Sequence, residues 1–341
     1  MFPFVARRTQ SYYYAGTLTA LAPIAHFGES TGGIEQNLRR VGILLPTGRS
    51  LRVPQISGNA WRGQIRDAGM LAMLNTLEVY IDSDIRLSKA VFYLLFSGGA
   101  LTKESGRGVD MDLVRQLREL IPLLSVLGGA VGRQILAGKV SFSEIMPVCR
   151  ETAHLLPEEL RTHPMADKSI SDMLDVLHFT RMDDAKRETL AGAYLSLPDQ
   201  ILLEAPKVKK IAKKGGAEGE TEEIAAASGT AQQMRYGFEV FIPGTVFSAS
   251  INLMHATRLE YEALLMGLAA WSQKPVLGGK SGIGLGTVSM QFADWVKLDP
   301  LLQRDTTEVG APLFTELQTF FTERKAEIVQ LLYELGTRYA D

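Results

Sequence analysis

A cluster of glycines around one cation and one hydroxyl is the part of this sequence with the clearest chemistry. The stretch Gly278–Gly286 reads Gly-Gly-Lys-Ser-Gly-Ile-Gly-Leu-Gly. Glycine costs backbone entropy, so such a dense cluster indicates a loop that exposes its N–H groups or approaches another backbone closely. Exposed N–H groups beside Lys280 and Ser281 are typical of a seat for phosphate oxygens. A tight connection between a helix and a strand, with Lys280 in solvent, explains the same residues equally well.

Two common glycine-rich nucleotide motifs do not fit this stretch. A Walker A loop needs a glycine five residues before the Gly-Lys-Ser, where this chain has Lys274. A dinucleotide fingerprint opens a helix after a strand. Here the glycines run into Thr287–Phe292, which alternates as a strand does. The sequence therefore predicts neither kind of nucleotide site.

A second candidate group consists of arginines with no acid near them in the sequence. Between Gln36 and Arg66 there is no aspartate or glutamate, but there are six arginines: Arg39, Arg40, Arg49, Arg52, Arg62 and Arg66. Ser57-Gly58-Asn59 can cap a helix that follows it. In that helix Arg62 and Arg66 lie four residues apart, on one face near the positive end of the helix dipole. We interpret the pair as an anion site; a solvated helix face is the alternative.

The composition is that of an ordinary globular protein. With 341 residues, 46% hydrophobic and 22% charged, the chain can hold two or three compact units. A net charge of −2 argues against a protein that coats nucleic acid with its whole surface, so anion binding should be local. Cys149 is the only cysteine, which indicates a reducing cytoplasm. The absence of a signal peptide and the short apolar run Leu120–Gly132 predict a cytoplasmic protein without a membrane partner.

Strand and helix patterns predict an α+β module that is split by a helical insertion. The first part has strands over Tyr12–His26, Val41–Leu45 and Leu51–Ile56 and the helix that Ser57 begins. Residues 67–197 have a helical pattern, with helices over Val114–Leu124, Ile145–Leu156 and Ser169–Phe179. The last part has strands over Tyr236–Ile242, Thr245–Met254 and Thr287–Phe292 and helices over Arg258–Trp271 and Leu313–Leu335. Together the two outer parts predict a ferredoxin-like (RRM-like) unit.

The stretch Gln200–Gln233 has too little apolar content to bury a core. Its lysines are followed by glutamates, glycines and alanines, and they include Lys207, Lys209 and Lys210. Such a segment is either a linker or a projecting finger that becomes ordered on a polyanion. Strand-like residues on both sides favour the finger.

No metal, cofactor or catalytic group is predicted. The five histidines have no ligand spacing with the cysteine or with one another, and the paired aspartates are typical of caps and solvated turns. We find no nucleophile–base pair in the sequence.

Three segments of the chain, taken in order, resemble motifs of the backbone subunit (Cas-seven type) of class 1 CRISPR effector complexes. This subunit belongs to the RAMP superfamily. The first is Leu21–Gly28, with a His-x-Gly turn at its end, and the second is Ile56–Arg66. The third is Val246–Ile251, which leads through a helix to the Gly278–Gly286 loop. The length of the chain and its helical insertion are most similar to those of the type IV version of this subunit.

The resemblance implies a palm (1–66 and 236–341), helical fingers (67–197) and a projecting thumb hairpin (198–235). Such subunits polymerise along the spacer of a guide RNA (crRNA), assemble with other effector subunits and present the guide to a target nucleic acid. By position, the resemblance implies that the RNA contacts come from Arg39, Arg40, Asn59, Arg62, Gln64, Arg66, Gly279, Lys280 and Ser281 in the palm and Lys207, Lys209, Lys210 and Arg235 in the thumb. Phosphate contacts of this kind carry no sequence preference.

One departure from the family concerns cleavage of a target RNA. Members that cleave carry a catalytic aspartate in the loop after the first strand. In the corresponding stretch of this chain, Glu29–Glu35, the only acidic residues are glutamates. A structural, non-catalytic subunit is therefore the first hypothesis. An RNA endonuclease that uses Glu35 or His26 is the alternative, and an enzyme for a small phosphorylated metabolite is a third possibility.

Overall fold

The computed structural model describes residues 9–28, 35–79, 87–99, 110–132, 134–181, 234–292, 296–298, 305–308 and 314–338. Contacts between residues divide the chain into two compact units. The larger unit comprises Met1–Ser30, Asn37–Asp175 and Glu239–Asp341, and the smaller comprises Thr31–Gln36 and Val176–Phe238. The fold is mixed α+β, with antiparallel pairing in its largest sheet.

The larger unit is built on an antiparallel sheet with seven strands among the described residues. The strand order is β14-β13-β1-β11-β7; β12 also pairs with β1, and β8 with β11. Their bounds are β1 Gln10–Ala20, β7 Val140–Phe142, β8 Met146–Pro147, β11 Val246–Ala256, β12 Val288–Phe292, β13 Val296–Leu298 and β14 Asp305–Glu308. The two central strands, β1 and β11, are more than 200 residues apart in the sequence.

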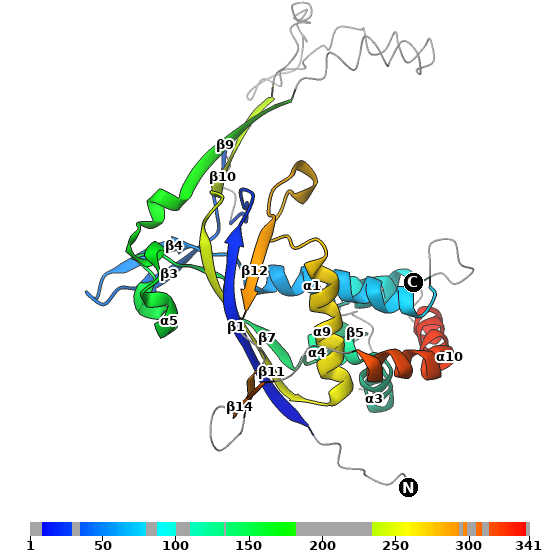
Figure 1. Ribbon diagram of the computed structural model, residues 1–341. Coiled ribbons are helices and arrows are strands. Elements are labelled where there is room, and N and C mark those ends of the chain that lie inside the picture. Colours follow the sequence, from blue (N-terminus) through cyan, green and yellow to red (C-terminus); the bar gives the residue numbers. More distant parts are fainter. Residues whose placement is uncertain are drawn as a thin grey trace, which may run out of the picture. The chain divides into compact units, whose positions relative to one another are not determined.

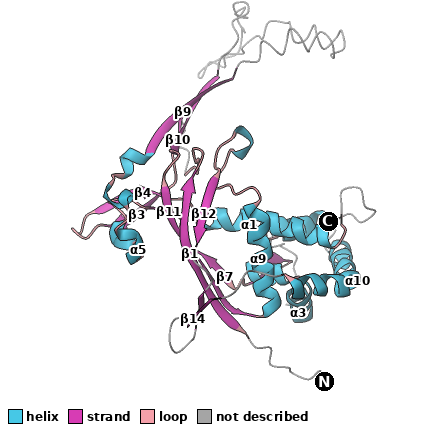
Figure 2. Cartoon of the chain, in the orientation of Figure 1, coloured by secondary structure: helices cyan, strands magenta, loops and turns pink. Residues whose placement is uncertain are grey.

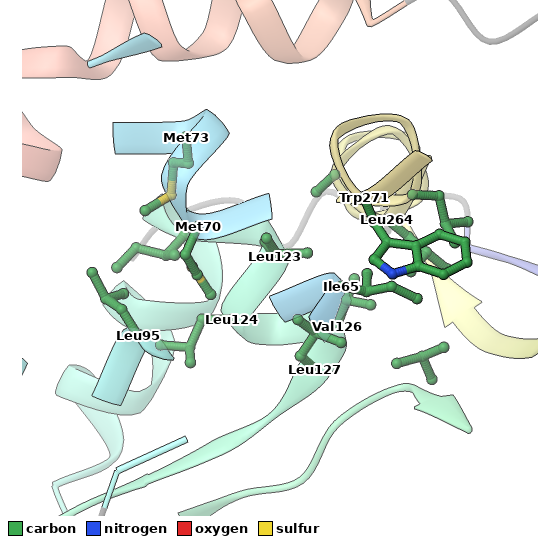
Figure 3. Close-up of a cluster of buried hydrophobic side chains, with 14 of the residues drawn as sticks. Ile65, Met70, Met73, Leu95, Leu123, Leu124, Val126, Leu127, Leu264 and Trp271 are labelled. Atoms are coloured by element: carbon green, nitrogen blue, oxygen red, sulfur yellow. The ribbon is translucent and has the colours of Figure 1, made fainter. Parts of the chain in front are cut away.

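Two long helices, α1 (Gly58–Thr76) and α9 (Arg258–Ser272), cover one face of this sheet (Figure 1). They cross closely at two glycines, since a Cβ added to Gly69 would lie 3.0 Å from the Cα of Gly267. Around the crossing, Ile65, Leu123, Leu264 and Trp271 form part of the hydrophobic core (Figure 3). Other described helices of this unit include α2 Lys89–Phe96, α3 Met111–Leu120, α4 Pro122–Leu127 and α10 Thr315–Arg338.

Short elements complete the larger unit (Figure 2). Two hairpins join β3 (Arg40–Leu44) to β4 (Ser50–Pro54) and β5 (Gly129–Val131) to β6 (Gln134–Leu136). Three single helical turns and one short helix follow β8: η1 Ala153–Leu155, α5 Glu158–Arg161, η2 Pro164–Asp167 and η3 Ile170–Met173. Another helical turn, η5 (Ser281–Ile283), lies in the glycine loop. None of the described helices is long and apolar enough to cross a bilayer.

The smaller unit contains β2 (Glu35–Gln36) and most of β9 (Leu174–Arg181) and β10 (Met234–Phe241). These three strands form one sheet, and β10 pairs with β2 in parallel, with Gly237 opposite Glu35. Phe179, Tyr236 and Phe238 pack against one another, with ring centroids 5.3–5.8 Å apart. Aromatic packing across neighbouring strands is a common source of sheet stability.

The structure confirms the predicted hairpin, the helix that Ser57 begins, the two strands around Pro243-Gly244 and the later helices and strand. Two predicted helices are wrong. Within Ile145–Leu156 the residues of β8 pair with β11, and Thr152 closes a turn by donating to the Pro147 carbonyl at 2.5 Å. Within Ser169–Phe179 one helical turn leads directly into β9. In both stretches the strand pairs with a partner far away in the sequence, which local periodicity cannot reveal.

Candidate nucleic-acid interface

The start of α1 is where the first two sequence motifs meet. Ser57 is the N-cap, and its side chain accepts a hydrogen bond from the Asn59 backbone N–H at 3.2 Å. The Ser57 N–H in turn donates to His26 Nε2 at 3.1 Å. The first turn of the helix carries no acid, and Asn59 is exposed. The positive end of the helix dipole is therefore not neutralised by a carboxylate in the first turn of its own helix.

His26 holds this helix start in place as a neutral ring. Burial lowers its pKa from the usual value of 6.5, and the charge of Arg39 lowers it further, while Glu144 acts in the opposite direction. A neutral imidazole has one acceptor nitrogen, and here that acceptor is Nε2. The backbone adds a second tie, since the Arg39 N–H donates to the His26 carbonyl at 2.8 Å.

The glycine loop packs against the residues just before His26. The Gly279 N–H donates to the Ala25 carbonyl at 2.8 Å, and the Gly286 N–H to the Pro23 carbonyl at 2.9 Å. Gly278 has a φ of +74°, and a Cβ on it would lie 2.2 Å from the Ala25 carbonyl oxygen. Only glycine combines this backbone conformation with this approach. The close-approach explanation of the glycine cluster is thus confirmed at Gly278.

Gln64 connects the glycine loop to α1. Its Nε2 donates to the Gly278 carbonyl at 3.1 Å, which places the third sequence motif beside the other two. Beyond Gly279 the loop projects: Lys280 has a left-handed backbone with a φ of 63°, and Gly279–Gly284 are exposed. The start of α1, the His26 turn and this projecting loop form one continuous region, which we call the motif junction.

The arginines of the acid-free stretch are not equivalent. Arg39 forms a bidentate pair with Glu144, at 2.7 and 3.1 Å, and Arg40 pairs with Glu239. Glu239 also accepts from the Leu38 N–H at 2.8 Å. The argument that these arginines lack acids was therefore wrong, because residues more than a hundred positions away supply them. Half-buried Arg62 makes no hydrogen bond or ion pair within the described part of the chain.

Arg66 does not belong to the anion site that the sequence predicts. Its side chain is only 3% exposed. The guanidinium donates to the carbonyls of Leu127 and Gly128 at 3.1 and 2.8 Å, and to that of Leu95 at 3.5 Å. These carbonyls end α4 and α2, so Arg66 caps two helix ends. Burial, with the neighbouring charge of Arg62, lowers its pKa to about 10, which leaves it charged at neutral pH.

Several predicted contacts fall where the structure gives no test. Lys207, Lys209 and Lys210 lie outside the described residues, and Arg235 lies in β10. The proposed RNA contacts of these four side chains stay predictions, as does a role for Glu35, which lies in β2. Within the described residues, no three His, Cys, Asp or Glu side chains form a group that could hold a metal ion.

Sequence reasoning missed the roles of Glu144 and Glu239. Both lie in segments that look unremarkable locally, Glu144 just after β7 and Glu239 inside β10. The only available signal was indirect: a stretch with six arginines and no acid requires either a ligand or acids from elsewhere in the chain.

Comparison with known proteins adds evidence at the level of the fold. No family model matches the chain, and no curated protein matches it. A chain of a solved "Type IV-B CRISPR Complex" is 20% identical, with a TM-score of 0.51 over 89% of this chain and 96% of that chain. The crystal structure of Thermofilum pendens Csc2 is 11% identical, with a TM-score of 0.38 over 97% and 82%. The chain thus shares its fold with a type IV CRISPR complex chain, as the sequence resemblance predicted.

Proposed function

We propose that this protein is a guide-RNA binding backbone subunit of a type IV-like CRISPR effector complex. The observation that carries this proposal is the motif junction: segments from three parts of the sequence meet at the start of α1, in a region that carries Arg62, Asn59, Lys280 and Ser281. The shared fold with a type IV-B complex chain supports the same function.

The chemistry of the motif junction suits phosphate rather than bases. Helix N-termini and projecting glycine loops bind anions through N–H groups, and an arginine without an ion pair adds a charge-assisted hydrogen bond. In this proposal these groups contact phosphate oxygens and not base edges. Contacts of this kind hold a strand by its backbone and leave its sequence free for pairing. Arg39 and Arg40 lie beside the junction and contribute charge that Glu144 and Glu239 partly neutralise.

We assign the palm to the sheet of the larger unit. Among its strands, β12, β1, β11 and β7 lie in that order, with α1 between β1 and β7 in the sequence and α9 between β11 and β12. This arrangement supports a ferredoxin-like palm. Helices α2 to α4 belong to the proposed fingers, and residues 198–235 to the proposed thumb. β7 and β8 lie within 67–197 but pair with β11, so the palm sheet includes part of the insertion.

Several copies of the chain bind side by side along the spacer of one crRNA, together with other effector subunits, and the guide pairs with the target. The role is structural and not catalytic. In the competing endonuclease hypothesis His26 is a proton carrier, but its Nε2 already accepts the Ser57 N–H in the arrangement that positions α1.

The test is to purify the protein from a host that expresses a CRISPR array and to ask whether a defined small RNA co-purifies. We expect several copies on one RNA, and we expect Arg62→Glu with Lys280→Glu to weaken RNA binding roughly 100-fold, because two charge-assisted contacts become repulsive. Arg115→Glu with Lys168→Glu, at two exposed positions away from the motif junction, makes the same change in net charge and should keep the RNA. A monomer free of nucleic acid, with the array present, contradicts the proposal.

A further inference from the structure

Along β1 and β11 the second face of the central sheet carries mostly small or polar side chains. Along β11 the residues Phe247, Ala249, Ile251 and Leu253 are buried beneath the helices, so the alternate residues point to the other face. These alternate residues are Ser248, Ser250 and Asn252, and their partners on β1 are Thr17, Ala15 and Tyr13. In Figure 1, α1 and α9 lie on one side of the sheet and α5 on the other.

A cavity of about 510 Å³ lies on this second face. One wall is the sheet, with Tyr13, Ala15, Ser248 and Ser250, and the other wall is mostly apolar and is formed by Leu155, Leu156, Pro157, Glu159 and Leu160. Small-molecule sites in proteins have this size and character: mostly apolar walls with a few convergent polar groups. The polar groups here are the serine hydroxyls and the carboxylates of Glu144 and Glu159.

The cavity adjoins the motif junction through one ion pair. Glu144 lines the cavity and also binds Arg39, whose backbone N–H donates to His26. A strand whose phosphates contact the motif junction therefore lies near the side of the cavity that Glu144 lines.

The charges of the cavity decide which part of a nucleotide can enter. The residues that line it include two acids and no lysine or arginine, so a phosphate is repelled. A nucleobase fits, because the aromatic ring of Tyr13 and the apolar walls can contact the faces of the base. Hydroxyl and carboxylate oxygens can accept hydrogen bonds from its amino group. Glu144 can accept further hydrogen bonds because a carboxylate has about four lone-pair sites.

We propose that this cavity binds one unpaired nucleobase of the strand whose phosphates contact the motif junction. The inference rests on the proposed function and adds to it a base-contacting subsite on the palm. It predicts that affinity for single-stranded RNA has a component that depends on the presence of bases, beside the phosphate component.

The experiment compares a cytidine oligoribonucleotide with an abasic ribose-phosphate oligomer of the same length, using the full chain and fluorescence anisotropy. We expect the cytidine oligomer to bind about tenfold more tightly, in the range that stacking of one base gives. Ser250→Leu fills the cavity and should remove this preference while it leaves affinity for the abasic oligomer unchanged. Asn252→Leu, on the same face of β11 but not part of the cavity wall, should keep the preference.

The variants separate this proposal from the proposed function. Arg62→Glu should weaken both oligomers equally, because it removes a phosphate contact. Equal binding of the two oligomers by the unaltered protein, or a preference that persists in Ser250→Leu, overturns the base subsite and leaves the backbone role intact. Binding of neither oligomer overturns both. If Ser250→Leu does not fold, Ala15→Leu fills the cavity from the opposing position on β1.

Discussion

At the scale of single residues, two arginines on one helix lie in opposite environments. Arg62 and Arg66 are one helical turn apart, and the sequence predicts the same anion-binding role for both. In the structure Arg66 is buried against backbone carbonyls, whereas Arg62 stays half-exposed at the motif junction. Spacing alone could not separate them, because the groups that Arg66 satisfies are helix ends 29 to 62 residues away.

Replacement of Arg66 should therefore affect stability. We expect Arg66→Met to lower the free energy of unfolding by about 2–4 kcal/mol, because the carbonyls of Leu95, Leu127 and Gly128 lose a buried charged donor. Arg62→Met should change it by less than about 0.5 kcal/mol. Urea denaturation of the two variants measures both values. Similar values for the two variants would refute the structural role of Arg66.

His26 gives the protein a sensitivity to mild acid. Its pKa is lowered in the folded state, so the unfolded chain binds the proton more readily. Stability from the neutral ring is present above the unfolded pKa, near 6.5, and is lost as the pH falls through the lower folded value. We expect unfolding by urea to become easier between pH 7 and pH 5, and His26→Gln to reduce that dependence, since an amide oxygen accepts the Ser57 N–H without titrating. An unchanged pH profile in the variant would contradict this account.

At the scale of elements, glycines set how closely α1 and α9 approach. A Cβ at Gly69 would lie 2.6 Å from Leu123 Cδ2 and 3.0 Å from the Cα of Gly267. Gly63, on the same helix, has no heavy atom within 4 Å of the corresponding position. Both glycines thus lie inside the same helix, but only Gly69 is closely packed against neighbouring residues.

The same substitution at these two positions should have opposite effects. Gly63→Ala should raise the free energy of unfolding by about 0.5–1 kcal/mol, through helix propensity alone. Gly69→Ala should lower it by about 1–3 kcal/mol, because the crowding in the core outweighs that gain. Thermal and urea melts of both variants decide the point, and a stabilised Gly69→Ala would show that the two helices can move apart at little cost.

At the scale of the whole molecule, the sequence predicted the elements whose signals are local. The Ser57 cap, the hairpin after Arg39 and the helix before the glycine loop have local capping, turn and periodicity signals, and all are confirmed. The strands β7 to β9 and the acids that pair with Arg39 and Arg40 depend on partners distant in the sequence. Of the candidate site, the junction of the three motifs was predictable; the burial of Arg66 and the cavity behind Glu144 were not.

The order of strands in the central sheet has a consequence for synthesis on the ribosome. β1 ends at Ala20 and its neighbour β11 begins at Val246, so one central strand leaves the ribosome long before the other exists. At ~5–20 residues per second the wait is about 10–45 s. During that time an aromatic strand has both edges unpaired, and nascent chains with such edges aggregate readily. Because several copies of this chain bind along one RNA in the proposed assembly, every copy must pass through this exposed stage before it can join a complex.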